Sequence, residues 1–158
     1  DDNGQTWQPS GPILSSPPNI HPTVVELADG SLLCYMRYFA PGAGHIWQAR
    51  SYDQGETWTL AMPTGFKNPN SGIDLLRTAS GDLILVYNDS YHLRTPLNLA
   101  LSTDEGNTWP YHKVIESSDG DFAYPWLIQT GDGLLHLTYS YRYQTIKHVV
   151  FDERYLRT

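Results

Sequence analysis

The chain has 158 residues, a formal net charge of −7 and an isoelectric point of about 5.1. This acidity argues against a nucleic-acid backbone as partner, although a few local arginines can still bind a small anion. Cys34 is the single cysteine, which excludes an intrachain disulfide, and no apolar run approaches the length of a membrane span.

One phrase, Ser-x-Asp-x-Gly-x-Thr-Trp, recurs along the chain from its first residues. Its tail occupies residues 2–7, and complete copies occupy residues 51–58 and 102–109. The three aspartates are evenly spaced by 51 residues, and a fixed period of this size indicates a repeat architecture. The chain begins inside the first copy without a methionine, so we expect it to be processed, trimmed or part of something longer.

Each copy is expected to form a clip, a tight turn between two antiparallel strands. Its aspartate accepts backbone N–H groups, its glycine supplies a positive φ, and its tryptophan packs against a neighbouring layer. Three evenly spaced copies favour a structural role over a catalytic one. The structural residues predicted in the clips are Asp2, Asp53, Gly55, Trp58, Asp104, Gly106 and Trp109.

Between the clips the same order of strands is repeated. Residues 1–14 are expected to supply a lone outer strand, residues 15–65 and 66–117 two four-stranded units, and residues 118–158 an incomplete unit of three strands. In each unit the first strand ends at a Gly-containing hairpin signal, and an apolar second strand follows that signal. Aromatic residues make up 13% of the chain, and helical periodicity is absent over any useful length, so we predict an all-β fold.

The second strand of each unit is apolar on both faces, as in residues 83–86. Such strands are covered on both sides, as in the radially stacked sheets of a β-propeller. Three units cannot close a ring. We therefore expect one of two arrangements. Either two copies form a homodimer with six blades, in which each initial strand completes the other copy's last blade, or a longer chain supplies the missing N-terminal half.

The clips resemble the Asp boxes of sialidase-like six-bladed propellers, and the chain resembles the C-terminal half of such a protein. The resemblance extends from His21-Pro22 to Arg37 and through residues 68–72, 94–97 and 124–125. It implies a glycoside hydrolase acting on an acidic glycan. Asp boxes also occur in other propellers, so fold and activity are separate inferences.

The resemblance also implies roles for individual residues. Arg37 and Arg94 resemble the middle and third arginines that hold a sugar carboxylate, and Tyr124 resembles the nucleophile. His21 stands where the family has the glutamate that assists this tyrosine, which is a departure, and a histidine can serve as the base. The family's first arginine and its acid/base aspartate belong to the half that is absent.

Four further residues near strand ends are candidates for lining the pocket: Asn70, Asp74, Asn88 and Arg142. The remaining histidines lack metal-ligand spacing and there is no Gly-rich phosphate loop, so neither a metal nor a cofactor is expected. Two alternatives stay open. One is a non-catalytic carbohydrate-binding or structural propeller, and the other is a polysaccharide lyase in which His21 and Tyr124 transfer the proton.

Overall fold

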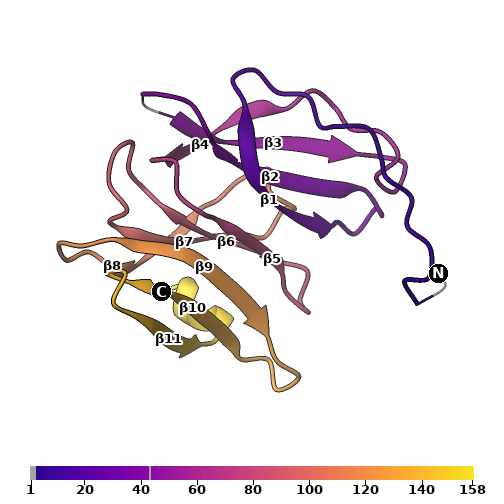
Figure 1. Ribbon diagram of the computed structural model, residues 1–158. Coiled ribbons are helices and arrows are strands. Elements are labelled where there is room, and N and C mark those ends of the chain that lie inside the picture. The colour runs from indigo at the N-terminus through magenta and orange to yellow at the C-terminus, as the bar shows by residue number, and fades with distance from the viewer. Residues whose placement is uncertain (1–2, 43) are drawn as a thin grey trace.

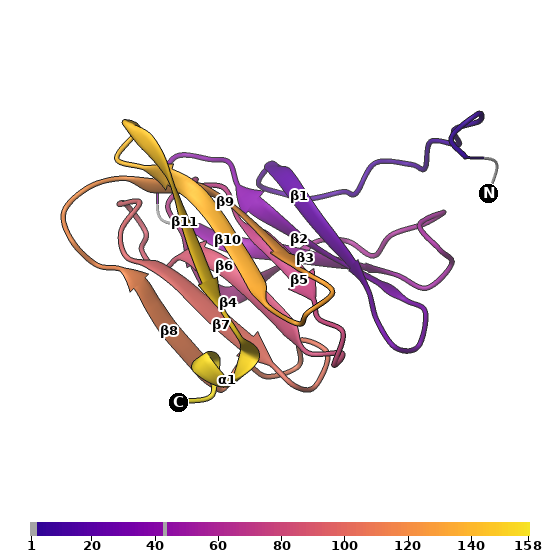
Figure 2. The ribbon, with the colours of Figure 1, turned by 90° about the horizontal axis from the view of Figure 1, so that it is seen from below.

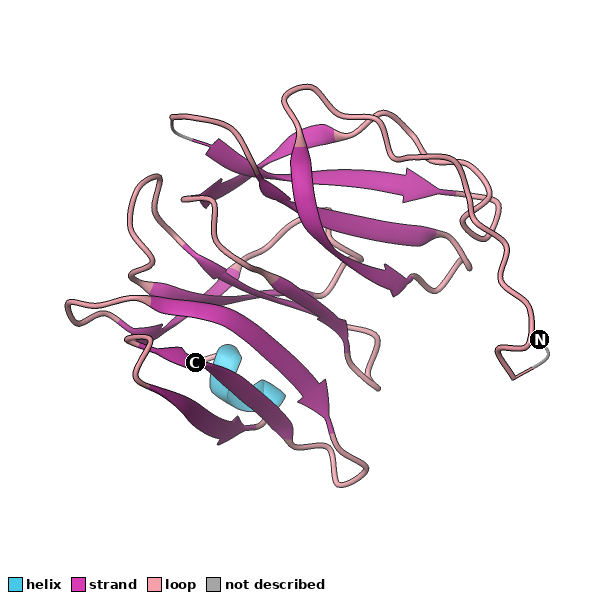
Figure 3. Ribbon diagram, viewed as in Figure 1, coloured by secondary structure: helices cyan, strands magenta, loops and turns pink. Residues whose placement is uncertain are grey.

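The computed structural model of the chain describes residues 3–42 and 44–158, so Asp2 of the first clip lies outside the described residues. Within them, eleven strands form three antiparallel sheets that follow one another along the chain (Figures 1 and 3). The expected all-β class is confirmed.

Each sheet is a meander of consecutive strands. Sheet one contains β1 (Asn19–Glu26), β2 (Leu32–Tyr38), β3 (Gly44–Ser51) and β4 (Met62–Asn68). Sheet two contains β5 (Asp74–Arg77), β6 (Leu83–Asn88), β7 (Leu97–Ser102) and β8 (Tyr111–Glu116). Sheet three contains β9 (Phe122–Gln129), β10 (Leu135–Tyr141) and β11 (Thr145–Phe151), and the short helix α1 (Glu153–Leu156) follows it. In the part of the chain described, no helix is long and apolar enough to cross a membrane.

Strand β6 shows why the second strands are apolar throughout. All six of its residues are buried, and consecutive side chains point to opposite faces of the sheet. Leu83 and Leu85 belong to the core cluster shared with sheet one, whereas Ile84 and Val86 belong to the cluster shared with sheet three. Sheet two is therefore the middle layer of a stack of three, which Figure 2 shows from below.

The first strands β1, β5 and β9 lie next to one another where the three sheets meet, with β5 in the middle. This arrangement brings residues 51 or so positions apart to one place. His21 and Tyr124 lie near the starts of β1 and β9, and Gly72 lies just before β5.

The two complete clips have matching hydrogen bonds. Asp53 Oδ1 accepts from Thr57 N–H at 2.9 Å, and Asp104 Oδ1 accepts from Thr108 N–H at 2.8 Å. The residue after each aspartate and the glycine that follows it both have positive φ, with Gly55 at 92° and Gly106 at 82°. The geometry is that of a tight turn closed by side-chain hydrogen bonds.

The segment before sheet one differs from the expectation. Residues 3–14 form no strand, and Trp7 and Leu14 are 86% and 65% exposed. A strand requires a partner edge, and the backbone contact given for this segment is the bond that Ala61 N–H donates to the Leu14 carbonyl. The pairing expected with another blade remains a prediction.

Candidate functional site

His21 and Tyr124 occupy equivalent places at the start of β1 and β9. Both are in the left-handed region, with φ of 50° and 51°, where a residue with a side chain is uncommon. The register of each strand with its neighbour shifts at this point, between Ile20 and Pro22 in β1 and opposite Thr138 and Ser140 for β9. Such irregularities redirect side chains and concentrate at functional sites.

Gly72 lies between these two residues, just before β5. A Cβ at this position would come within 2.8 Å of His21 Cε1 and 3.2 Å of Tyr124 Cδ1. The two rings are tilted by 47°, and their centroids are 6.4 Å apart. The absence of a side chain at position 72 therefore lets the imidazole and the phenol approach each other.

Asn70 joins the two predicted arginines. Its Oδ1 accepts a hydrogen bond from Arg37 Nε at 2.7 Å, and its backbone carbonyl accepts one from Arg94 Nη2 at 3.3 Å. Asn70 also has a positive φ of 56°, a conformation that asparagine tolerates well. Arg37 comes from β2 and Arg94 from the loop between β6 and β7, so Asn70 holds two separate elements together.

Tyr124 lies against the guanidinium group of Arg94. The Arg94 Cζ atom is 5.3 Å from the centre of the Tyr124 ring. The pKa of Tyr124 is lowered, first by its hydrogen bond with Arg94, then by the charge of Arg94, with a smaller contribution from Arg37. Both arginines therefore favour the ionised phenol, although Tyr124 remains 48% exposed.

Tyr143 completes the cluster and was missed in the sequence. Its hydroxyl accepts a hydrogen bond from Arg94 Nη1, and the Arg94 Cζ atom lies 5.8 Å from its ring centre. Burial raises its pKa, so the phenol stays protonated. A tyrosine in the turn between β10 and β11 carries no sequence signal that would place it beside a residue 49 positions earlier.

The environment of Tyr124 favours the charged form of that side chain, whereas the environment of His21 favours the neutral form. Its pKa is lowered, mainly by burial and then by the positive charge of Arg37, while Asp74 opposes the shift. The imidazole is consequently neutral at pH 7 and can accept a proton. The site thus pairs a phenol that loses its proton more readily with a neighbouring base.

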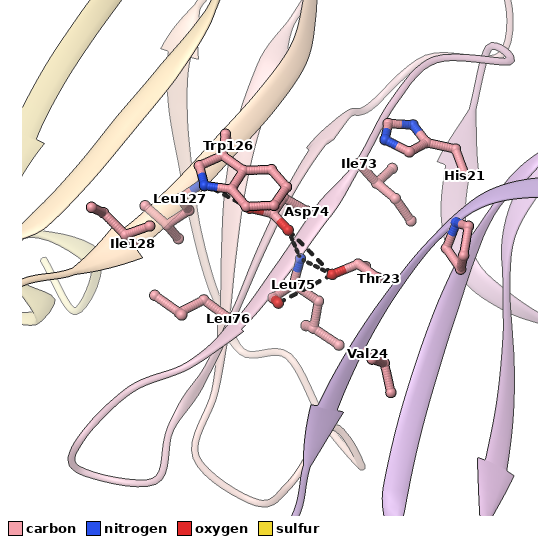
Figure 4. A pocket seen from close by; sticks show the side chains of 11 residues that line it. His21, Thr23, Val24, Ile73, Asp74, Leu75, Leu76, Trp126, Leu127 and Ile128 are labelled. Carbon is pink, nitrogen blue, oxygen red and sulfur yellow. Dashed lines mark hydrogen bonds between the residues drawn. The ribbon is translucent and has the colours of Figure 1, made fainter. Parts of the chain in front are cut away.

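Asp74 was a candidate for binding substrate, but its contacts link strands (Figure 4). Its Oδ1 accepts from Thr23 Oγ1 of β1 at 3.2 Å and from its neighbour Leu75 N–H at 3.1 Å, and its Oδ2 accepts from Leu127 N–H of β9 at 2.7 Å. Burial raises its pKa against these bonds. Asp74 therefore ties the three inner strands together below the site.

Asn88 and Arg142 also lie apart from the expected surface. Asn88 is fully buried, and its Nδ2 donates to the carbonyl of Pro96 at 3.2 Å and to that of Phe122 at 3.1 Å. These bonds hold the Arg94 loop against the start of β9. Arg142 is exposed and donates to Ser118 Oγ at 3.3 Å. Asn88 supports the cluster from beneath, whereas Arg142, in the same β10–β11 turn as Tyr143, donates to Ser118.

The structure thus brings together Arg37, Asn70, Arg94, Tyr124 and His21, and adds Tyr143. Within residues 3–42 and 44–158, no group of three or more His, Cys, Asp or Glu side chains is placed to hold a metal ion. The cluster combines two cations, two phenols and one imidazole, which is a set suited to an anionic ligand and to proton transfer.

Comparison with known proteins identifies the family of the chain. Residues 1–137 match the family described as BNR repeat-like domain. An anhydrosialidase of Macrobdella decora is 25% identical over 159 residues, which cover 89% of this chain and 20% of that protein.

Solved sialidases share the fold. The NanB sialidase from Streptococcus pneumoniae superposes with a TM-score of 0.84 at 19% identity, covering 99% of this chain and 27% of that one. The Hadza microbial sialidase Hz136 gives a TM-score of 0.77 at 22% identity, covering 98% of this chain and 31% of that one. The chain therefore spans between about a fifth and a third of the length of these relatives.

Proposed function

The chain belongs to the BNR repeat-like family and is sialidase-like, and on this premise we propose that it forms half of a six-bladed propeller that binds and processes an acidic sugar. Sheets one, two and three would be consecutive blades. The axial cluster around Tyr124 would be the part of the site that this half contributes, and the remaining groups would come from polypeptide outside it.

The observation that carries the proposal is the pair of arginines fixed on Asn70. Arg37 uses its Nε for this bond, so its two terminal nitrogens are not consumed by it. A guanidinium group matches the geometry of a carboxylate, and each charge-assisted hydrogen bond contributes roughly 1.5–3 kcal/mol. A sugar carboxylate placed between Arg37 and Arg94 would bring the rest of the ring against Tyr124.

Tyr124 would then act as the nucleophile on the anomeric carbon. A neutral phenol avoids the repulsion that a carboxylate nucleophile would meet from an anionic sugar. An unperturbed phenol has a pKa of about 10 and needs activation to act as a nucleophile at neutral pH. Arg94 lowers that pKa and the neutral His21 accepts the proton, so His21 takes the part that a glutamate has in the sialidase pattern.

A polysaccharide lyase is the second candidate, and the same His21 favours it. β-Elimination from a uronide needs a base to remove the proton beside the carboxylate and an acid to protonate the leaving oxygen. A neutral imidazole and a phenol 6.4 Å apart between their ring centres can serve these two roles. In this reaction no bond forms between Tyr124 and the sugar.

The test is to assay the 158-residue chain with a fluorogenic α-sialoside and, separately, to follow formation of unsaturated uronide from pectic and glycosaminoglycan substrates. Sialic acid binding is titrated at low and high salt. We expect Arg94→Ala to abolish sialic acid binding, and Tyr124→Phe to abolish turnover while binding persists. Arg154→Ala is the matched control, because the Arg154 side chain is 90% exposed and pairs with Asp152 in its own turn.

Hydrolysis lost in Tyr124→Phe supports the sialidase-like reaction, and unsaturated product lost in His21→Ala supports elimination. Salt-sensitive binding without turnover leaves a carbohydrate-binding protein. If sialic acid and uronides fail to bind a folded chain, or if Arg94→Ala binds them as well as Arg154→Ala does, the acidic-sugar site is wrong.

A further inference from the structure

A groove of about 500 Å³ opens between the outer part of sheet one and sheet two. Strand β4 lines it with Phe66 and Lys67, and sheet two lines it with Tyr87, Asn98 and His112. No residue of the Arg37–Arg94–Tyr124 cluster lines it. Its volume is within the range of about 300–1,000 Å³ that is typical of small-molecule sites.

Asn98 has an unusual place in this groove. Its side chain lies on the same face of β7 as Ala100, toward sheet one, and the residue is only 6% exposed. Its Oδ1 is buried without a hydrogen-bond partner among the described residues. Leaving a buried acceptor unpaired is unfavourable, so a donor supplied by a ligand would relieve a cost already present in the fold.

The wall beside Asn98 is aromatic and rigid. The Phe66 ring meets Tyr87 edge-on at 4.9 Å between centroids and Trp109 edge-on at 5.4 Å. These contacts fix the rings, and Trp109 lines the groove with Phe66. Fixed aromatic carbon next to a few polar groups is the combination that binds a ring with both C–H and O–H groups.

The charges of the groove are balanced. Lys67 Nζ and Asp89 Oδ1 form an ion pair at 3.2 Å, and both side chains remain about two-fifths exposed at the rim. A paired lysine offers little net attraction to an anion, whereas its remaining N–H groups and the free carboxylate oxygen can exchange hydrogen bonds with hydroxyls. The preferred ligand is therefore neutral and polyhydroxylated, unlike the ligand of the arginine cluster.

We propose that this groove is a second saccharide site, which binds a neutral pyranose ring. The ring C–H groups lie on Phe66 and Trp109, one hydroxyl donates to Asn98 Oδ1, and other hydroxyls reach the Lys67–Asp89 pair. The proposal does not depend on the reaction at Tyr124, because it concerns different residues and a ligand without charge.

Methyl β-D-galactopyranoside and methyl α-D-mannopyranoside, titrated separately into the ¹⁵N-labelled 158-residue chain, test the site. At least one is expected to shift the Asn98 side-chain amide and the Trp109 indole signals, with the same affinity at about 0.5 M NaCl, since a neutral ligand is not screened. Asn98→Leu is expected to weaken this binding about three- to tenfold and to lower the melting temperature less than Asn68→Leu does, because it removes an unpaired buried acceptor together with the hydrogen bond between the Asn98 amide and Tyr87.

Asn68→Leu is the matched control. Asn68 is also buried, but its amide donates to the Ser71 carbonyl and accepts from Ser71 N–H, so the same substitution there should lower the melting temperature. Arg94→Ala should leave binding of the galactoside or mannoside unchanged. The proposal is overturned if neither sugar shifts the groove signals, if salt or Arg94→Ala abolishes the binding, or if Asn98→Leu destabilises the chain as much as Asn68→Leu does.

Discussion

Asp53 and Asp104 are only partly buried, yet each organises a whole turn through both carboxylate oxygens. In the second complete clip, Asp104 accepts from Thr108 N–H, Thr108 Oγ1 and Ser102 Oγ. Asp53 repeats the set with Thr57 and Ser51. The carboxyl pKa of Asp104 is lowered chiefly by the backbone bond from Thr108, and that of Asp53 by the side-chain bond from Thr57.

These lowered pKa values predict how acid acts on the clips. A carboxyl with a pKa lowered by folding stabilises the fold at pH values above its ordinary pKa of about 3.9, and this contribution is lost as pH falls through the lower, folded value. We expect the melting temperature to fall with acid below about pH 4, and Asp104→Asn to flatten that fall. Calorimetry checks it, with Asp119→Asn in an exposed loop as control. An unchanged acid profile in Asp104→Asn would contradict the prediction.

Only part of the site can be predicted residue by residue. Arg37, Arg94 and Tyr124 follow from their positions in the family pattern, and the structure places them together. The strand-linking role of Asp74 could not be predicted, because its position in the sequence does not give the direction of its side chain, which accepts bonds from β1 and β9. Tyr143 depends on how the β10–β11 turn folds over the Arg94 loop, which is a tertiary contact without local signature.

At the scale of elements, the meanders could be predicted because the 51-residue period and the repeated order of apolar strands and hairpin signals can be read from the sequence. The run of residues 83–86 is apolar because β6 separates two cores. The helix α1 was missed because four residues are too few for helical periodicity, and its start depends on Asp152 Oδ1 accepting from Tyr155 N–H. The left-handed backbone conformations of His21 in β1 and Tyr124 in β9 could likewise not be predicted from the sequence.

The strand starts suggest a prediction for Gly72. In Gly72→Ala the new methyl group would press on His21 Cε1 at 2.8 Å and on Tyr124 Cδ1 at 3.2 Å, and overpacking of this kind costs about 1–3 kcal/mol. The rings would have to separate, so we expect a lower melting temperature together with weaker ligand binding at the arginine cluster. Gly131→Ala is the control, because a Cβ there meets no atom within 4 Å. Equal behaviour of the two variants would show that the approach of His21 and Tyr124 does not depend on Gly72.

At the scale of the whole molecule, the two outer sheets of the stack carry exposed apolar side chains on the faces that point away from sheet two. Trp126 and Ile146 of sheet three are each 65% exposed, and their neighbours on the same face include Ile128 and Val150 at 46%. On the outer side of sheet one, Val24 is 54% exposed. His136, Thr138 and His148 lie among these apolar side chains on the face of sheet three. Exposed apolar side chains that gather on one face mark an interaction site or a liability for aggregation.

The three clip tryptophans differ in how they are packed. Trp109 packs on sheet one through Phe66 and Tyr35 and is half-buried. Trp58, which was expected to be buried at a blade junction, is also only half-buried, against the outer face of sheet one and Ile13. Trp7 is 86% exposed. Among the described residues, Trp109 is therefore the clip tryptophan that packs on the preceding sheet.

We therefore expect the 158-residue chain to close its open faces with a second copy, giving a twofold dimer of about twice 17.9 kDa in which sheet three of each copy meets sheet one of the other. Trp126→Glu places a charge in the middle of that contact and should yield the mass of a single chain in light scattering. Tyr52→Glu, at a residue that is 73% exposed in a clip, is the matched control and should leave the dimer intact. A wild-type chain that is monomeric at micromolar concentration and keeps a cooperative thermal transition would contradict the dimer, since its apolar faces would then be stable in water without a partner.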